Sequence, residues 1–490
     1  MTAAPPVVVA GAGITGLTLA SELDRAGVPV VVLELSAPGE RTAAGVALNT
    51  AAVSVLERRG LYEELRPFAL PLPQVHFSLL WLDPDRVGGQ ARYPHLLPQS
   101  RVEERIEASL GAGVEIRRGH EVTGLTQHDG GVRVEVTGPG GTYDLDAAYL
   151  VGADGPRSAV RALAGIAFPG EAAEASGLVA DVRVDFAALP PEVFGARHFD
   201  AGLFMGAPVG PDRLRLITTE FGRPPQEGPS GPVTGEELAG AALRIAGLDL
   251  GPLEPLWSAR FDDAARQAEQ YRAGRVLLAG DAAHVHYPLG GLALSTALED
   301  ALNLGWKLAA SVDGTAPQGL LDSYHTERHP AGRAALRATR AQTSLLHPTE
   351  RIGPLREILR EVVAFDGPNR FLVDLAGGVG TRYEAPLPEG ADEPHPLLGL
   401  LAPEVELATA EGPVGLHSLL RTGRGLLLRF TDAPLDADGW KDRVRTVTAE
   451  PHPELDAAAL LVRPDGHIAA ATDDPDTLHH ALTTWFGEAN

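Results

Sequence analysis

The sequence predicts an α/β protein in which an antiparallel β-sheet is inserted between two parts of a strand–helix domain, with a smaller unit behind it. Three observations carry this prediction. Residues 7–34 contain a β-branched run, a glycine-rich turn, an apolar helical segment and a second β-branched run. Strand-like runs with one helical segment among them fill residues 172–262. The strand–helix pattern returns at 274–281, and residues 386–396, rich in Pro and acidic residues, form a linker to the last unit.

The N-terminal motif is a dinucleotide-binding βαβ unit of the Rossmann type. The strand Val7–Ala10 leads directly into Gly11-Ala12-Gly13-Ile14-Thr15-Gly16. Each glycine has its own task, because Gly11 permits the tight turn, Gly13 lets the backbone approach a pyrophosphate, and Gly16 allows helix and strand to pack closely.

The segments after this turn complete the nucleotide site. The helix N-terminus at Ile14 and Thr15 presents free N–H groups and the positive end of the helix dipole to phosphates. The second strand ends in Glu34, which can accept hydrogen bonds from an adenosine ribose. Because a carboxylate repels a 2′-phosphate, the tightly bound ligand is expected to be FAD or NAD and not NADP.

Composition excludes several classes of function. The 490 residues allow two or three domains, and the net charge of −24 argues against nucleic acid or an anionic membrane as partner. The chain has no cysteine, which excludes disulfides, thiolate metal sites and a catalytic thiol. No run reaches the roughly 18 apolar residues of a membrane span, and no signal peptide is recognised. We expect a cytoplasmic protein.

The remaining pattern suggests where elements and domains lie. Helices are expected at 51–65, 102–110, 235–245, 297–312 and 320–345, from Ile352, near Gly415 and up to Phe486. Strands are expected at 147–151, 177–186, 198–208, 213–219, 255–261, 275–279 and 425–430, with hairpins at 121–136 and 457–471. We assign 1–171 and 273–390 to the dinucleotide-binding domain and its helices, 172–272 to the inserted substrate sheet, and 391–490 to the C-terminal unit.

Two further signals point to the same ligand. Asp154-Gly155 follows one predicted strand, and Gly280-Asp281 follows another and precedes a helix. A carboxylate at Asp281 can accept a hydrogen bond from a ribityl hydroxyl, and the next helix can direct its N-terminus at a flavin. Either aspartate taken alone would be read as a helix N-cap.

These motifs resemble one family over nearly the whole chain. The matching segments are Gly11–Gly16, Pro98-Gln99-Ser100, Val151–Ser158, Gly280-Asp281-Ala282-Ala283-His284, Asn303–Leu308 and Leu321–Arg328. The chain resembles the group A FAD-dependent monooxygenases, the 4-hydroxybenzoate hydroxylase-like flavoproteins. Within them it is most similar to the aromatic polyketide hydroxylases of angucycline and anthracycline pathways.

The resemblance implies a cofactor and a reaction. FAD would be bound with Glu34 on the ribose, Gln99 near the ribityl chain, Asp281 at the ribitol and pyrophosphate, and Asp154-Gly155 at both FAD and a transient NADPH or NADH. Reduced FAD would form a C4a-hydroperoxide that hydroxylates an electron-rich ring. The C-terminal unit would be thioredoxin-like and, without cysteines, would serve in packing or dimerisation of a monomer or homodimer.

The flavin loop departs from the family pattern. Gly-Gly-Gln-Gly-Met/Leu-Asn is usual after Pro288, whereas this chain has Gly290-Gly291-Leu292-Ala293-Leu294-Ser295. Two arginines common near the cofactor are also replaced, by Leu35 and Ala44, for which Arg41 and Arg101 could compensate. These changes are explained either by drift with backbone contacts intact or by altered flavin chemistry.

Further candidates concern the substrate. By the resemblance, Tyr287, Pro288, Gly291 and Leu292 lie by the flavin, and Gly280, Gly291, Ala293 and Leu294 contact FAD. Phe204, Met205, Tyr287 and Leu292 are the expected substrate contacts, and apolar residues of the inserted sheet favour a large flat substrate although they could equally be core: Leu178, Val182, Phe199, Leu203, Phe204, Met205 and Leu216.

Other titratable residues receive structural readings. His284 and His286 resemble a metal pair only by spacing, so no metal site is expected. His325 and Arg328 are expected to face solvent or a domain contact. No general base can be named, because a phenol can be activated by deprotonation in a suitable pocket.

The predicted function is an FAD-dependent, NAD(P)H-using monooxygenase that hydroxylates a polycyclic aromatic polyketide in antibiotic biosynthesis. One alternative keeps the flavin but performs Baeyer–Villiger insertion or a redox-neutral or reductive step, because of the atypical loop 290–295. Another alternative is a binding protein that has lost the flavin and catalyses nothing.

Overall fold

A six-stranded sheet in the order β20-β21-β12-β1-β2-β8 forms the centre of the computed structural model. The structure describes residues 5–39, 45, 47–72, 74–87, 93–225, 231–347, 349–384, 394–430 and 435–489. The strands are β1 (Val7–Ala10), β2 (Val30–Glu34), β8 (Val114–Arg118), β12 (Tyr149–Gly152), β20 (Arg272–Ala273) and β21 (Val276–Leu278). Every neighbouring pair except β20 with β21 is parallel. The carboxyl ends of β1, β2 and β12 therefore meet at one edge, where open α/β sheets bind ligands.

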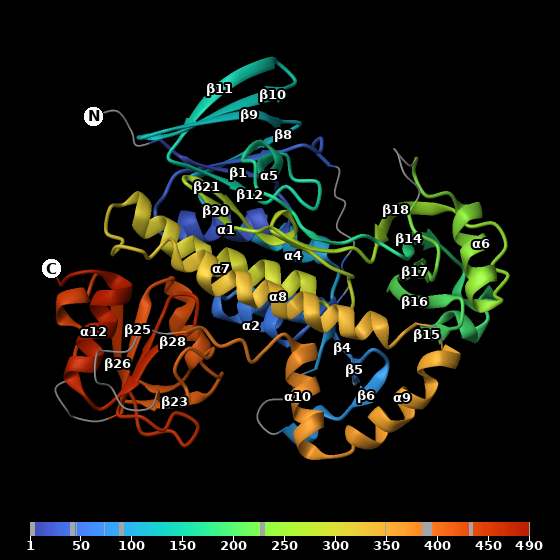
Figure 1. Ribbon diagram of the computed structural model, residues 1–490. Helices are drawn as coiled ribbons and strands as arrows, with labels where there is room; N and C mark the ends of the chain where they lie inside the picture. The colour runs from blue at the N-terminus through green and yellow to red at the C-terminus, as the bar shows by residue number, and fades with distance from the viewer. Residues whose placement is uncertain are drawn as a thin grey trace.

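Two layers cover this sheet (Figure 1). Helices α1 (Ile14–Arg25) and α7 (Leu292–Val312) lie on one face, and a three-stranded antiparallel sheet lies on the other. That smaller sheet consists of β9 (Glu121–His128), β10 (Gly131–Gly138) and β11 (Gly141–Ala147). The four residues of β1 are buried, as are those of β12, which explains their uncharged sequences.

The inserted unit is a five-stranded antiparallel sheet in the order β15-β16-β17-β14-β18. Its strands are β14 (Ser176–Arg183), β15 (Gly195–Phe199), β16 (Gly202–Gly210), β17 (Arg213–Glu220) and β18 (Pro255–Asp262), and helix α6 (Gly235–Ala246) covers its outer face. The single strand predicted at 198–208 is two strands that turn at residues 200–201, because the apolar pattern continues across the turn.

Residues 66–98, for which no helix or strand is predicted, contain several short strands. Helices α2 (Thr50–Arg58), α3 (Tyr62–Leu65) and α4 (Gln99–Ala108) frame the short strands β3 (Ala47–Leu48), β4 (Leu70–Pro71), β5 (Val75–Phe77), β6 (Leu80–Leu82) and β7 (His95–Leu96). The hairpin β5–β6 packs against the later helices α9 (Thr349–Val362) and α10 (Asp366–Gly377).

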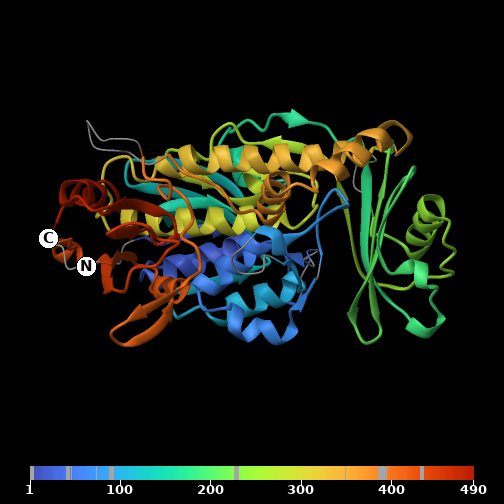
Figure 2. The same cartoon turned by 90° about the horizontal axis from the view of Figure 1, so that it is seen from below.

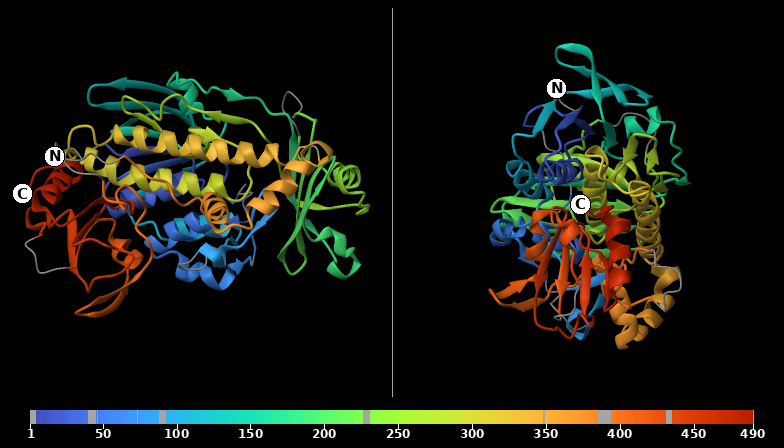
Figure 3. Two further views of the ribbon diagram at one scale, coloured as in Figure 1. Left: turned by 60° about the horizontal axis from the view of Figure 1, so that its bottom comes forward. Right: turned by 90° about the vertical axis from the view of Figure 1, so that its left-hand side faces the viewer.

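The molecule is long, with the inserted sheet at one end and the C-terminal unit at the other (Figure 2). Helix α8 (Ser323–Ser344) runs alongside α7 towards the inserted sheet, as two further views also show (Figure 3). Among the residues the structure describes, no helix combines the length and apolar character that a membrane span requires.

The C-terminal unit is built on a four-stranded sheet in the order β26-β25-β27-β28. Its elements are β23 (Glu406–Thr409), β24 (Gly412–Gly415), α11 (Leu416–Leu419), β25 (Gly425–Arg429), β26 (Val444–Thr448), β27 (Ala459–Val462), β28 (Ile468–Thr472) and α12 (Pro475–Phe486). Strands β25 and β26 are parallel and the other pairs antiparallel. Trp306 of α7 belongs to the same apolar cluster as Trp485 and Phe486 of α12, so this unit packs directly on the domain of the central sheet.

Four buried charges join the two units: Lys307 of α7, Glu327 of α8, and Arg463 and Asp465 at the turn between β27 and β28. Glu327 accepts hydrogen bonds from Lys307 Nζ at 2.6 Å and from two Arg463 nitrogens at 2.6 and 2.8 Å. Burial opposes ionisation of Glu327, but Arg463 and Lys307 outweigh it and hold its pKa at about 2. We call these residues the Glu327 cluster.

The depressed pKa makes stability depend on pH. In the unfolded chain the Glu327 carboxyl protonates near its ordinary pKa of 4.5, whereas in the folded protein it stays charged at that pH. Its contribution to the free energy of unfolding is therefore complete above pH 4.5 and is lost as pH falls towards 2. At about 1.4 kcal/mol per pKa unit, this group contributes at most about 3 kcal/mol.

Glu327→Gln should lower the free energy of unfolding at pH 7 by about 3–5 kcal/mol, because Lys307 and Arg463 then face an uncharged amide. It should also flatten the acid limb of the stability profile, measured by urea unfolding between pH 7 and 3. Glu115→Gln, which breaks the exposed pair with Arg117, serves as the control and should change little. Equal effects of the two substitutions would contradict this account.

Candidate functional site

One cavity of about 910 Å³ joins the carboxyl edge of the central sheet to the inserted sheet. Its walls include the glycine-rich turn, the ends of β1, β2 and β12, the loop from Tyr287 to Leu294, and the inner face of the inserted sheet. This volume lies in the range of small-molecule and cofactor sites, and the walls come from segments far apart in sequence.

The glycine-rich turn has the geometry of a pyrophosphate cradle. Gly11 has φ +102°, and a Cβ there would lie 2.3 Å from the carbonyl oxygen of Ala153. A Cβ on Gly16 would lie 1.9 Å from the carbonyl oxygen of Gly11. At Gly13 a Cβ would meet no atom within 4 Å, so the backbone is open to the cavity there. Because Gly13 provides no side-chain cap for α1, the first N–H groups of the helix are available to a ligand.

Glu34 supports this cradle from the end of β2. Its carboxylate accepts hydrogen bonds from the Ala12 N–H at 2.7 Å and the Ser36 N–H at 2.8 Å. A carboxylate has about four acceptor positions, so capacity for ribose hydroxyls is left on the cavity side. Gly280 has φ +61°, and a Cβ added there would lie 2.4 Å from Thr15 Oγ1. The segment around Gly280 therefore packs closely against the start of α1.

The two aspartates have different roles. Asp154 accepts hydrogen bonds from Ser158 Oγ at 2.5 Å and from the Val160 N–H at 3.1 Å, at the start of helix α5 (Ala159–Leu163). Its carboxylate thus serves the helix start, and Asp154 and Gly155 border the cavity. Asp281 is exposed to the cavity, and the protein around its carboxyl group partly removes it from water and so raises its pKa. FAD contacts by either aspartate stay predictions.

The other predicted cofactor residues are divided. Gln99 borders the cavity at the start of α4, and its Nε2 donates to Glu103 Oε1 at 2.8 Å. Arg101 does not border the cavity but lies at the surface, with its guanidinium 4.7 Å from the centre of the Phe68 ring, and its cofactor contact stays a prediction. Arg41 lies outside the described residues.

The loop after β22 (His284–Val285) forms the wall between the cradle and the inserted sheet. Pro288, Gly291, Ala293 and Leu294 border the cavity. Leu292 does not border it, because its side chain is only 3% exposed at the first turn of α7, and its expected substrate contact stays a prediction.

Ser295, one turn further along α7, explains part of the departure from the family pattern. Its hydroxyl is fully buried and accepts a hydrogen bond from Asn49 Nδ2 at 2.9 Å. Asn49 also caps α2 through its Oδ1. A longer side chain at position 295 would displace Asn49, so Ser295 fits the local packing of this chain.

The inserted sheet presents a flat apolar row to the cavity. Five residues in register, one from each strand, share the inner face: Ala196, Met205, Ile217, Val179 and Ala259. Because side chains alternate along a strand, Phe204 lies on the other face. It is 1% exposed in the core against α6 and only borders the cavity. Leu178, Val182, Phe199 and Leu216 belong to the same core, whereas Leu203 borders the cavity.

Tyr287 connects the loop to this sheet. Its hydroxyl lies 2.6 Å from Thr219 Oγ1 of β17, and its ring centre lies 6.0 Å from that of Phe261 of β18. Burial raises the pKa of Tyr287 to about 12. A neutral phenol and an alcohol thus form one polar pair beside the apolar row.

The histidines and Arg328 are structural. Asp300 of α7 accepts hydrogen bonds from Arg328 Nε at 2.7 Å and the Gly280 N–H at 3.1 Å, and its Oδ2 lies 2.7 Å from His284 Nε2. Arg328 is buried, so the prediction that it faces solvent is wrong. Its guanidinium also donates a hydrogen bond to the Tyr383 hydroxyl. Burial lowers the pKa of His286 to about 4. Within the described residues no group of three potential metal ligands occurs.

Comparisons with known proteins agree with this geometry. Residues 4–339 match the family model of an FAD binding domain, and residues 395–489 match the C-terminal domain of aromatic-ring hydroxylases. The chain is 44% identical to a dialkyldecalin synthase of Streptomyces rugosporus, over 99% of each chain. It is 42% identical to the 12-dehydrotetracycline 5-monooxygenase/anhydrotetracycline 6-monooxygenase of Streptomyces rimosus, over 98% of each. An aromatic hydroxylase from angucycline biosynthesis superposes with a TM-score of 0.91 at 40% identity, covering 100% of both chains.

The cradle predicts different effects for two glycines. Gly13→Ala should leave the melting temperature of the FAD-free protein unchanged, because the added methyl group enters open space at an ordinary φ of −75°. It should weaken FAD binding about tenfold or more, because that space belongs to the pyrophosphate. Gly16→Ala should lower the melting temperature itself. Thermal melting and an FAD fluorescence titration measure both effects, and native FAD affinity in Gly13→Ala would contradict the assignment.

Proposed function

Because the chain belongs to the family of FAD-dependent aromatic-ring hydroxylases, we propose that it hydroxylates a polycyclic aromatic polyketide, using NADPH or NADH as reductant. Its relatives include a monooxygenase of anhydrotetracycline and a hydroxylase from angucycline biosynthesis. The observation that carries the proposal is the flat apolar row of the inserted sheet, with the polar pair Tyr287–Thr219 beside it. We further propose that the enzyme works in the cytoplasm, as a monomer or homodimer.

The residues that would hold FAD are those of the cradle and the adjoining loop. The N–H groups at the start of α1 would bind the pyrophosphate, Glu34 the ribose, and Asp281 the ribityl chain, with Pro288, Gly291 and Ala293 beside the ring system. Bound FAD would accept a hydride from the nicotinamide and activate dioxygen for transfer to the ring. The cavity walls would keep bulk water away from this reaction.

The substrate would lie against the row of Met205, Ile217 and Val179 with a phenolic oxygen at Tyr287. The neutral Tyr287 hydroxyl can donate a hydrogen bond to that oxygen while the Thr219 hydroxyl donates to Tyr287. A hydrogen bond to a phenolate favours the ionised, electron-rich form of the ring, which is the form that accepts oxygen most readily.

Tyr287→Phe should raise KM for a phenolic substrate about tenfold or more, because the buried hydrogen bond is lost while the ring and its contact with Phe261 remain. Stopped-flow and steady-state kinetics with anhydrotetracycline measure this effect. The visible spectrum of bound FAD should not change. If KM stays at the native value, the polar pair does not bind the substrate oxygen.

The direct test of the function uses the purified FAD-loaded protein with NADPH and anhydrotetracycline under ¹⁸O₂. The expected product carries one labelled oxygen, and NADPH oxidation is faster with the phenol than without it. Turnover without label, or no turnover with any phenol tested, would overturn the proposal.

A second candidate function is a redox-neutral ring-forming reaction on a polyketide. It is favoured by the atypical flavin loop, where Ala293 borders the cavity, and by the similarity to a dialkyldecalin synthase. If this loop suppresses oxygen chemistry, Ala293→Gly should increase substrate-dependent oxygen consumption at an electrode. Unchanged consumption would show that Ala293 does not control it.

A further inference from the structure

The hairpin β5–β6 has an unusual two-residue turn beside the cavity. Ser78 and Leu79 have φ +57° and +58°, and within the described residues they are the only non-glycine residues with positive φ. Two consecutive left-handed residues define a turn that normally contains Asn or Gly, because a side chain is strained there. Such strain persists only where the surroundings enforce it, and it is concentrated at functional sites.

Two helices enforce the conformation of this turn. The Ser78 N–H donates to Gln342 Oε1 at 3.2 Å, and the Ser78 hydroxyl donates to the Gln342 carbonyl oxygen at 2.7 Å, both on α8. The Ser78 carbonyl oxygen accepts from Arg356 Nη1 of α9 at 2.8 Å. Ser78 is completely buried, so its three polar groups are all paired within the protein.

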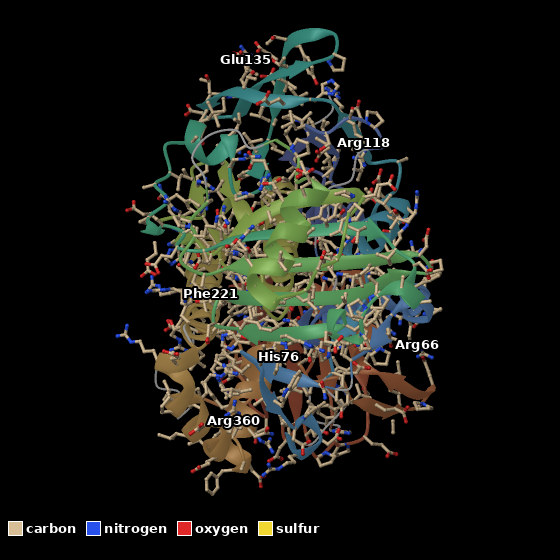
Figure 4. All side chains as sticks on the ribbon, turned by 90° about the vertical axis from the view of Figure 1, so that its right-hand side faces the viewer. Arg66, His76, Arg118, Glu135, Phe221 and Arg360 are labelled. Carbon is tan, nitrogen blue, oxygen red and sulfur yellow. The ribbon has the colours of Figure 1, made fainter. Side chains whose placement is uncertain are left out.

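The clamped turn places Leu79 at one end of the cavity. Leu79 borders the cavity together with His76 and Leu346, and the carbonyl oxygen of Leu346 contacts His198 of the edge strand β15. The Tyr287 hydroxyl contacts Thr219 of the middle strand β17, and its ring lies near Phe261 of the opposite edge strand β18. Figure 4 shows His76 below the lowest strand of the inserted sheet. From the polar pair at the middle strand β17, the register Thr219–Leu203–His198 leads across β16 to the edge strand β15, whose His198 contacts Leu346.

We propose that Leu79 is a specificity-determining residue that sets the length of the substrate chamber, and that Ser78, Gln342 and Arg356 are the positioning residues that hold it there. The proposal rests on the proposed function, since it takes the chamber to receive a fused-ring phenol. A fused-ring substrate anchored by its oxygen at Tyr287 would extend across β16 and β15 towards Leu79. A shorter phenol leaves this end of the chamber unfilled.

The strain is tested without any substrate. In an ordinary conformation Gly is less stable than Ala, whereas at a left-handed position the order reverses. Leu79→Gly should therefore melt at a higher temperature than Leu79→Ala in the FAD-loaded protein. A lower melting temperature for Leu79→Gly would show that the turn is not held in the left-handed conformation in solution.

The role of Leu79 in setting the chamber length is tested by substrate binding. Binding is followed as the change in the visible spectrum of bound FAD during titration with anhydrotetracycline or 1-naphthol. Leu79→Ala should change the ratio of the two dissociation constants by about tenfold. Leu80→Ala provides the matched control, because Leu80 is 1% exposed in the core on the other side of the same hairpin. It should lower the melting temperature and leave the ratio unchanged.

Gln342→Ala, which removes the acceptor for the Ser78 N–H, should shift the ratio in the same direction as Leu79→Ala. If the ratio of the two dissociation constants stays at the native value in Leu79→Ala, the proposed role of Leu79 is overturned, but the proposed hydroxylation is not. Normal substrate binding without incorporation of labelled oxygen overturns the proposed hydroxylation but not the proposed role of Leu79. If neither phenol changes the spectrum of bound FAD, the chamber does not bind phenols and the proposed role of Leu79 is overturned as well.

Discussion

The structure depends on the close approach of three backbone segments where side chains have no room. Gly11 touches the Ala153–Asp154 segment, Gly16 touches Gly11, and Gly280 touches Thr15, each at a distance that a Cβ would violate. This contact brings the carboxyl ends of parallel strands together and leaves Gly13 as the open part of the cradle. The cavity follows from this constraint, since every other wall is attached to one of these segments or packs against them.

A second constraint keeps the far walls in place. The Asp300 carboxylate, in the middle of α7, forms hydrogen bonds with the Gly280 N–H, the His284 ring and the Arg328 guanidinium. Burial would raise the pKa of Asp300, but Arg328 and His284 outweigh that effect and lower it. The Glu327 cluster, further along the same helices, holds the C-terminal unit against them. The long helices therefore connect the cradle to the inserted sheet at one end and to the C-terminal sheet at the other.

Much of this could be predicted from the sequence, because glycine-rich turns and buried strands have strong local signals. The nucleotide cradle and the inserted sheet are examples. Which face a residue occupies was less predictable: Phe204 and Met205 are both apolar, and only the register of β16 separates core from cavity. Leu292 is similar, since the start of α7 determines which way it points.

Long-range partners gave no sequence signal at all. The bond between Asn49 and Ser295 spans 246 positions. The hairpin β5–β6 also escaped detection, because its turn contains Ser78 and Leu79 in place of the Asn or Gly that marks such turns. The local rule fails there because α8 and α9 supply the stabilisation that the turn residues lack. The contact of Arg101 with Phe68 gave no sequence signal either, because Phe68 lies in a segment without a clear pattern.

The central claim is that one cavity holds FAD at the glycine cradle and the aromatic substrate against the inserted sheet. The most direct measurement is a crystal structure of the FAD-loaded protein soaked with anhydrotetracycline. The account predicts the pyrophosphate beside Gly13, the flavin ring beside Pro288 and Ala293, and the fused rings on the face that carries Met205 and Ile217. Density for the rings elsewhere, or a flavin remote from that face, would contradict it.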